Sequence, residues 1–350
     1  MLLLTDGIQL TEMNKYLKAL NGFRLDNTKQ TLTAVSVFSG GGGLDLGLSL
    51  SGFTVRFSTD KEEGCCRTLE RNFPLSYVKT SCIKKVSGAE IKDLTGICDF
   101  DLLAGGPPCQ AFSILGKRKS YNDDRGRSVF EYIRLIKEIK PRAFLFENVY
   151  GLLTVNEGKD WKYLLELFKD TGYRLYWQVL NAADYGVPQM RRRLFVAGFR
   201  RQANFIFPLP KLEPCSFIPS YLALEDIEGT KNNEVRRHGE RVRSRYAKLL
   251  PGERDKLSWT DRIDPSKPSG TVLVGSGRGG CKPFVHPYEP RVLTPREAAR
   301  LQSFPDWYVF EGSMTQQYRQ IGNAVPPILG QAISGAIAQA LNVSAEDLGK

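Results

Sequence analysis

The sequence predicts an α/β protein with a mostly parallel, doubly wound sheet and a smaller, irregular second domain. Between residues 34 and 200, short apolar runs alternate with stretches of helical periodicity, as strands and helices do in such a sheet. Glycine-rich or proline-rich turns follow two of these runs. From about residue 201 the alternation is lost, and proline and basic residues become frequent, which predicts the second domain.

The individual elements follow from local pattern, with apolar runs predicting buried strands and apolar residues at helical spacing predicting helices. Pro141 ends one helix, and Thr294-Pro295 is a signature of a helix start. The expected strands cover 34–38, 53–58, 100–103, 143–146 and 194–197, and the expected helices cover 44–51, 128–139, 161–169 and 327–341. We therefore expect an N-terminal arm (1–30), a main domain (31–200), a smaller domain (201–290) and a C-terminal segment (291–350) that returns to the main domain.

Composition restricts the class of protein. The hydrophobic fraction of 41% is ordinary for a globular protein, and no apolar run is long enough to span a membrane. Residues 1–4 are too short for a signal-peptide core, so we expect a cytoplasmic protein that does not contact a membrane. Seven cysteines without Cys-x-x-Cys spacing and only two histidines favour reduced thiols and no metal site.

The charge balance favours a polyanionic partner. The net charge is +11 and the isoelectric point is about 9.3, as is common for proteins that bind nucleic acid. Basic residues are concentrated at 191–193 and in the segment 231–248. Each cluster taken alone is also compatible with an ordinary solvated surface.

Cys109 follows the apolar run 100–103 in the segment Ala-Gly-Gly-Pro-Pro-Cys-Gln. A rigid turn that presents a thiol at the end of a strand makes that thiol a candidate nucleophile. The alternative is a structural loop with a small buried cysteine.

A glycine-rich turn at 38–44 follows the first strand, and Asp60 ends the next strand about twenty residues later. Glycines allow close approach of a ligand, and an acid at this spacing can bind ribose hydroxyls, so an adenosine cofactor would fit. The absence of a clean Gly-x-Gly-x-x-Gly pattern argues against a dinucleotide. The turn could also be purely structural.

Two further motifs stand at strand ends. Glu147, in Glu-Asn-Val, could protonate or hydrogen-bond a ring nitrogen, or it could simply cap the next segment. Arg191 and Arg193, in Gln-Met-Arg-Arg-Arg, would share one side of a strand by alternation and could both face Cys109. A basic edge that keeps the strand soluble is the alternative.

These blocks occur in a fixed order and are followed by Arg-Glu-Ala-Ala-Arg-Leu-Gln-Ser-Phe-Pro-Asp and Gln-Ile-Gly-Asn-Ala-Val-Pro-Pro. Together they resemble the signature blocks of DNA cytosine-5 methyltransferases, with the bacterial restriction–modification enzymes most alike in size and layout. The resemblance extends from about residue 35 to about residue 330 and implies a Rossmann-like, S-adenosylmethionine-dependent fold. It also implies that 201–290 is a target recognition domain.

The resemblance implies transfer of a methyl group from S-adenosylmethionine to C5 of a flipped-out cytosine in a short, specific double-stranded DNA sequence. Cys109 would add to C6 of the base, and Glu147 would protonate or hold N3. Arg193 and Arg191 would hold the cytosine O2 and the Cys109 loop. The segment 110–127 matches the family's mobile active-site loop.

The remaining site residues are also implied by the family's motifs. Cys82 is a departure, because the family often has an acid near this position to bind the adenine amino group. Cofactor binding is expected of Phe38, Gly40, Gly42, Leu44, Asp60, Ile83, Pro108, Asn323 and Val325. DNA binding is expected of Gln110, Ser113, Lys117, Arg118, Arg236, Arg237, Arg241 and Arg278. The glycine-rich stretch 275–280 is a recognition loop or a flexible surface loop.

The expected biological role is protection of host DNA, with a cognate restriction endonuclease that acts on the same sequence without forming a stable complex. We expect a monomer associated with the nucleoid. A tRNA cytosine-5 methyltransferase is the main alternative, since such enzymes share these blocks. A nicotinamide-dependent oxidoreductase and a DNA-binding regulator without chemistry are the other two, and the intact Cys109 and Glu147 motifs argue against both.

Overall fold

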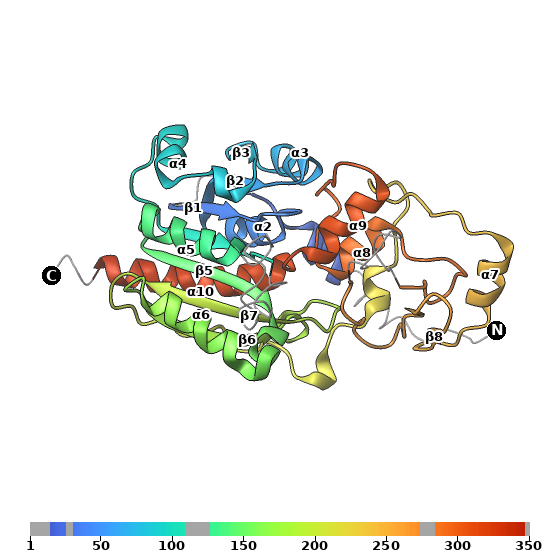
Figure 1. Cartoon of the computed structure of the whole chain (residues 1–350). Coiled ribbons are helices and arrows are strands. Elements are labelled where there is room, and N and C mark those ends of the chain that lie inside the picture. The colour runs from blue at the N-terminus through green and yellow to red at the C-terminus, as the bar shows by residue number, and fades with distance from the viewer. Residues whose placement is uncertain (1–14, 26–30, 109–126, 274–283, 347–350) are drawn as a thin grey trace, which may run out of the picture. The chain divides into compact units, whose positions relative to one another are not determined.

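A computed structural model describes residues 15–25, 31–108, 127–273 and 284–346 (Figure 1). The chain divides into two compact units. The sheet unit comprises Asp26–Asn181, Arg192–Leu209 and Leu329–Lys350, and the loop-rich unit comprises Met1–Leu25, Ala182–Arg191 and Pro210–Ile328.

A seven-stranded sheet forms the centre of the sheet unit, with strand order β3-β2-β1-β4-β5-β7-β6. The first five strands in this order are parallel, and β7 is antiparallel to both of its neighbours. The predicted α/β class with a mostly parallel sheet is therefore confirmed. The strands are β1 (Leu32–Val37), β2 (Phe53–Asp60), β3 (Tyr77–Thr80), β4 (Leu102–Gly105), β5 (Ala143–Val149), β6 (Arg174–Asn181) and β7 (Arg192–Phe199).

Helices cover both faces of this sheet (Figure 1). One apolar cluster joins α4, α5 and α6 to the side chains of Val35, Val37 and Phe146. Ser36 points to the opposite face because side chains alternate along a strand, and it bonds to Asp45 of α2. The helices are α2 (Gly43–Leu50), α3 (Glu63–Asn72), α4 (Gly88–Thr95), α5 (Arg127–Ile139), α6 (Lys159–Lys169) and α10 (Pro327–Glu346), with 3-10 turns at Ile83–Lys85, Tyr150–Leu153 and Val155–Gly158.

Helix α10 packs against α2 at very close range. A Cβ atom on Gly47 would lie 2.6 Å from the backbone carbon of Gly330, so only glycine allows this approach. The hydroxyl of Ser334 donates to the carbonyl of Gly47 and contacts the hydroxyl of Ser51. The final helix expected from the sequence is thus present, and it belongs to the sheet unit from Leu329 onward.

Local pattern did not predict the two edge strands or the helices α3 and α4. Strand β3 has only four residues, none of them buried, and most of β6 is exposed or half-buried. Edge strands of this kind lack the apolar run that marks a buried strand. Backbone pairing with β2 and β7 holds these two strands in the sheet, and the pattern of their side chains does not indicate it.

The loop-rich unit contains little regular structure in its described residues. Thr294 and Glu297 form a capping box at the start of α8, with the Thr294 N–H donating to the Glu297 carboxylate at 2.6 Å. Residues 15–21 are helical. The other elements are α7 (Glu240–Ala247), α8 (Pro295–Leu301), α9 (Met314–Asn323), β8 (Arg254–Asp255), β9 (Thr260–Asp261) and 3-10 turns at Ala182–Tyr185, Pro214–Ser216 and Ser220–Ala223.

One stretch, Met314–Asn342, is long and apolar enough to cross a membrane by composition, but 67% of its most apolar window is buried inside the protein. It consists of α9 and α10, with residues 324–326 between them outside any helix. Burial of this kind is expected of core helices.

Candidate active site

Three parallel strands bring the sequence motifs to one edge of the sheet. In the parallel register Val37 pairs with Gly105, and Gly105 pairs with Phe146. The residues that follow, Phe38, Gly106 and Glu147, therefore emerge at the same carboxyl edge, where ligands bind in open α/β sheets.

The carboxylate of Glu147 forms an ion pair with Arg193 at this edge. Arg193 Nε lies 3.0 Å from Glu147 Oε1, and the two side chains are only 11–12% exposed. Burial lowers the pKa of Arg193, and the nearby Glu147 carboxylate acts against this change. The antiparallel pairing of β5 with β7 creates the contact, because it sets Val149 opposite Arg193.

The turn that leads to Cys109 is held against β5. The amide of Asn148 donates to the carbonyl of Pro107 at 3.0 Å. A Cβ on Gly106 would lie 2.7 Å from Glu147 Oε2, so a glycine lets this turn pass beside the carboxylate. Pro108 is exposed at the end of the turn. Several predicted site residues lie outside the described residues: Cys109, Gln110, Ser113, Lys117, Arg118 and Arg278, together with the stretch 275–280.

The glycine loop after β1 has the conformation that a close ligand contact requires. Gly40 and Gly42 adopt φ of 53° and 74°, and even Phe38 has a φ of 56°, which is uncommon for a residue with a side chain. Added at Gly40, a Cβ would meet nothing within 4 Å, so there is space beside the loop. Leu44 is buried in the first turn of α2.

Asp60 connects this loop to the end of β2. Its Oδ2 accepts the Gly40 N–H at 2.9 Å, and its Oδ1 accepts the Glu62 N–H at 3.0 Å. Burial raises the pKa of Asp60, while these backbone donors act to lower it. A carboxylate has about four lone-pair positions, so two bonds leave it able to accept ribose hydroxyls as well.

Sequence reasoning assigned no role to Asp45, a buried acid beneath the glycine loop. It accepts hydrogen bonds from Ser36 and Ser58, each at 3.0 Å. Burial raises the pKa of Asp45 to about 6, against the lowering effect of the two hydroxyl donors. The sequence signal that could have pointed to Asp45 is a single acid between two leucines, Leu-Asp-Leu, at the start of an otherwise apolar helix. Sequence reasoning likewise assigned no role to Asn148, although this residue belongs to the Glu-Asn-Val motif.

The other expected cofactor residues are placed as follows. Ile83 is buried in a short 3-10 turn, and Cys82 before it is exposed. Asn323 and Val325 belong to the loop-rich unit, where Asn323 ends α9 and Val325 is buried. Their part in cofactor binding stays a prediction.

Arg191 lies directly before β7, and Arg193 lies within it. The carbonyl of Arg191 accepts the N–H of Ala182 at 2.9 Å, next to the pairing of Asn181 with Arg192 between β6 and β7. The buried guanidinium of Arg191 donates to three backbone carbonyls of the loop-rich unit, those of Val272, Gly322 and Ala324. Cys109 lies outside the described residues, so the expectation that both arginines face it stays a prediction.

Three of the predicted DNA-contacting residues are described, and all three are exposed. Arg236 and Arg237 precede α7, and Arg241 lies in its first turn. Their side chains are available to solvent, as contact with a phosphate backbone would require.

The edge of the sheet thus combines a strand-end glycine loop, an acid on the second strand and a buried Glu147–Arg193 pair beside the Gly106-Pro107 turn. The model of the C-5 cytosine-specific DNA methylases matches residues 32–339. The chain belongs to this family. Among its relatives is the Type II methyltransferase M.XorII of Xanthomonas oryzae pv. oryzae, which is 34% identical over 89% of this chain and 86% of its own length. M.PspPI of a Psychrobacter species is 35% identical over 91% of this chain and 82% of its own length.

Solved structures agree with this membership. A prophage-encoded Escherichia coli protein assigned as a DNA modification methyltransferase superposes with a TM-score of 0.71 at 27% identity, covering 89% of this chain and all of the other. The S. pombe Dnmt2 methyltransferase shares the fold, with a TM-score of 0.66 at 18% identity. This chain is therefore a DNA (cytosine-5-)-methyltransferase of the restriction–modification type, with the family's Rossmann-like fold, and its substrate is DNA.

Proposed function

We propose that this methyltransferase transfers a methyl group from S-adenosylmethionine to C5 of one cytosine within a short, specific duplex DNA sequence. The observation that carries the proposal is the buried Glu147–Arg193 ion pair next to the Gly106-Pro107 turn, which leads directly to Cys109. A carboxylate held in this way beside the turn that precedes a cysteine suits a reaction that needs a nucleophile and a proton donor or hydrogen-bond partner together.

In this mechanism the Cys109 thiolate adds to C6 of the cytosine ring, while Glu147 protonates or hydrogen-bonds N3. The electron pair released into the ring makes C5 nucleophilic, and C5 would form the new bond to the methyl group as the bond from that group to the sulfonium sulfur breaks and a neutral thioether leaves. Loss of the C5 proton and departure of the Cys109 thiolate from C6 restore the aromatic ring. Covalent addition is needed because C5 alone is a weak nucleophile.

Arg193 has two roles in this account. Its Nε holds the Glu147 carboxylate at 3.0 Å and its Nη1 donates to the Arg192 carbonyl at 2.8 Å, so we assign the contact with the cytosine O2 to Nη2. Arg191 contributes indirectly, through the carbonyls that it binds at Gly322 and Ala324 on either side of Asn323. Asn148 positions the turn before Cys109.

The cofactor supplies an electrophilic methyl group when it is bound. The residues fit an adenosine group, because Asp60 keeps acceptor positions beside a glycine loop with open space at Gly40. Phe38, Gly42, Leu44, Ile83 and Pro108 are the further contacts that we propose, and the resemblance to the family alone assigns Asn323 and Val325 to the cofactor. Cys82 is a poor acceptor, so adenine recognition would depend on Ile83 and backbone groups.

The target base is stacked in the duplex, and the enzyme must rotate it out of the helix at a cost of about a few kcal/mol. Phosphate contacts would offset this cost, and we assign them to Arg236, Arg237 and Arg241 and to the segments 110–127 and 275–280. Region 201–290 would act as the target recognition domain. In the cell the enzyme would work as a monomer at the nucleoid and protect host DNA from an endonuclease that recognises the same sequence.

Methylation of tRNA cytosine is the second candidate, and the family model and the Type II relatives favour DNA over it. Both can be tested together. The wild type and the variant Cys109→Ala are incubated with tritiated S-adenosylmethionine and either a library of duplexes or total tRNA. We expect label at C5 of cytosine in one duplex context and none with Cys109→Ala.

Cys98→Ala is the matched control, because Cys98 is an exposed thiol on the loop before β4 and has no part in the mechanism. It should retain wild-type label incorporation. Label in tRNA but not in duplex DNA would indicate that the enzyme is a tRNA cytosine-5 methyltransferase. Undiminished incorporation by Cys109→Ala would contradict the covalent mechanism.

A further inference from the structure

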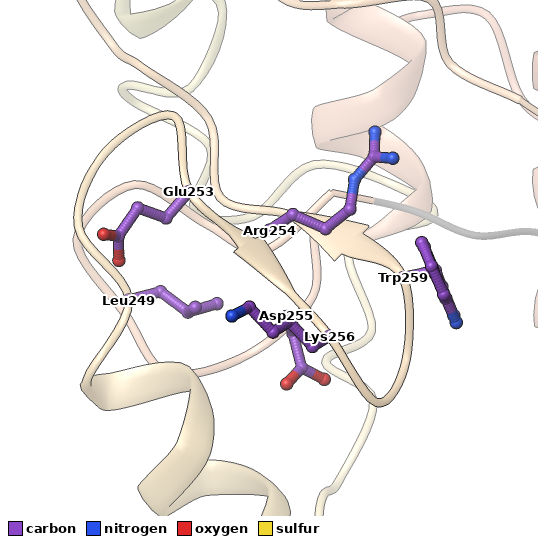
Figure 2. Close-up of a pocket in the computed structure, with 6 residues that line it drawn as sticks. All are labelled: Leu249, Glu253, Arg254, Asp255, Lys256 and Trp259. Carbon is purple, nitrogen blue, oxygen red and sulfur yellow. The ribbon is translucent and has the colours of Figure 1, made fainter.

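A short hairpin in the loop-rich unit has features that the reaction does not explain. Strands β8 and β9 pair over two residues each, Arg254 with Asp261 and Asp255 with Thr260, and the tip 256–259 connects them. Trp259 stands on one side of the hairpin and Leu249 on the other, around a hollow of about 600 Å³ (Figure 2).

Polar contacts hold the hairpin in one conformation. The guanidinium of Arg245, on α7, binds both carboxylate oxygens of Asp255 at 3.2 and 3.0 Å. Asp255 also accepts the N–H of Ser258 at 3.0 Å, and its carbonyl accepts the N–H of Trp259 at 2.7 Å. Arg254 pairs with Asp261 across the two strands. The hairpin and α7 therefore form one connected element.

This element presents large apolar side chains to solvent. Trp259 is 64% exposed and Leu257 is 67% exposed. Trp259 also adopts a φ of 54°, a conformation that is unfavourable for a bulky residue. Burial in a core would explain neither the exposure nor the strained backbone, whereas an aromatic side chain on a fixed support suits recognition of a partner.

The charge around the hairpin indicates what kind of partner this is. Residues 231–262 contain ten Lys or Arg and five Asp or Glu, a net charge of +5, while the whole chain has +11. Arg241, Arg243 and Lys256 are exposed, and Arg243 lies 3.8 Å from the Glu240 carboxylate. A hydrophobic protein partner would not need this excess of cations, but a duplex with its row of phosphates would.

We infer that the β8–β9 hairpin is a DNA-contacting element, in which Trp259 packs against the edges of base pairs in a groove and Lys256 contacts a phosphate. The inference rests on the proposed function, because it assumes that the substrate is duplex DNA. Aromatic and apolar side chains read base edges, such as the thymine methyl group, while lysines position the protein on the backbone. The hairpin then adds to both the affinity and the sequence preference of the enzyme.

The test measures binding of a labelled duplex that contains the methylated sequence, by fluorescence anisotropy at several salt concentrations. For Trp259→Ala we expect a Kd on the order of tenfold higher, with an unchanged dependence on salt. For Lys256→Gln we expect a salt slope reduced by about one. Trp259→Phe keeps an aromatic ring and should fall between wild type and alanine, which separates recognition from misfolding.

Trp177→Ala is the matched control, since Trp177 is also exposed but lies on β6 of the sheet unit. It should bind the duplex as wild type does. If Trp259→Ala binds the duplex as tightly as the wild type does, and the wild type methylates that duplex, the inference about the hairpin is wrong while the proposed function stands. Absence of any duplex binding or methylation by the wild type would overturn the proposed function and this inference together.

Two other outcomes would assign the hairpin a different partner. If Trp259→Ala abolished self-association in sedimentation experiments while duplex binding stayed intact, the surface would be a protein interface. If it weakened binding of tRNA and left duplex binding unchanged, the partner would be RNA. Either result would overturn the inference.

Discussion

The sheet unit and the loop-rich unit hold their chains together by different means. In the sheet unit, backbone groups pair along a seven-stranded ladder, and apolar side chains such as Phe144 and Phe146 fill the space under the helices. In the loop-rich unit, buried arginines satisfy the backbone. Arg296 donates to the carbonyls of Lys231, Pro305 and Tyr308, and Arg262 donates to those of Tyr246 and Pro287.

The difference shows what an irregular chain needs. Carbonyls that are buried outside a helix or sheet must find donors, and a guanidinium offers five of them in one plane. The arrangement has a cost, because burial disfavours the charged form and lowers the pKa of Arg296 to about 10. Surface residues of the loop-rich unit can therefore be substituted without loss of stability only while these buried arginines are retained.

The largest expected effect comes from Arg296→Met, which keeps the volume and removes the donors. Three carbonyls would lose the donor that Arg296 supplies, although that of Pro305 keeps the Tyr308 N–H, and we expect a loss of about 3–5 kcal/mol of stability. Hydrogen exchange should accelerate in the loop-rich unit around residues 231–234 and 305–310, while peptides from β4 and β5 keep their protection.

Arg241→Met is the control for this substitution, because Arg241 is exposed on α7. It should leave hydrogen exchange unchanged in both units. Equal acceleration in the two units by Arg296→Met would contradict the view that buried arginines stabilise only the irregular one.

The second prediction concerns the chemistry at the sheet edge. Glu147→Gln removes the proton donor and the charge that Arg193 binds, so we expect methyl transfer to slow by about a hundredfold or more. Binding of S-adenosylmethionine should not change, since Asp60 and the glycine loop are untouched. Single-turnover rates and calorimetric titration of the cofactor measure the two effects separately.

Gly47→Ala should damage the sheet unit selectively. The new methyl group would lie 2.6 Å from the backbone of Gly330, so α2 and α10 must move apart, at a cost of about 1–3 kcal/mol. Thermal unfolding and hydrogen exchange in these two helices would reveal it. Gly335→Ala is the control, because a Cβ there meets only the Ser51 side chain at 3.9 Å.

The smallest effect is a pH dependence from Asp45. Its pKa rises from 3.8 to about 6 on folding, so the folded state favours the protonated acid, and stability falls as pH rises through about 4 to 6. Between pH 5 and pH 8 this loss amounts to about 1 kcal/mol, and Asp45→Asn should remove it. Denaturant unfolding of both proteins at the two pH values measures the difference. An equal slope with pH in both would contradict it.

The sequence predicted the parts of this molecule that local patterns determine. The apolar runs of β1, β2, β4 and β5 identified the strands, and the ends of β2 and β5 singled out Asp60 and Glu147 as candidates. The Glu147–Arg193 ion pair was not predicted as a contact, because it depends on the antiparallel register of β5 and β7. The carbonyls of Val272, Gly322 and Ala324, to which the Arg191 guanidinium donates, could not be anticipated either, since they belong to distant parts of the chain.

The β8–β9 hairpin shows the same limit in the loop-rich unit. Two-residue strands carry no periodic pattern, and Trp259 in the printed sequence is indistinguishable from a buried core aromatic. Its exposure and its backbone conformation are visible only in the folded chain.

The central claim is that Cys109 forms a covalent bond to C6 of a cytosine in duplex DNA. A duplex with 5-fluorocytosine at the methylated position tests it directly, because fluorine cannot leave as a cation and elimination of the thiolate stops after methyl transfer. We predict a complex that survives denaturation and maps by peptide mass to Cys109, with slower formation by Glu147→Gln and none by Cys109→Ala. An active wild type that forms no such complex, or one attached through another residue, would contradict the account.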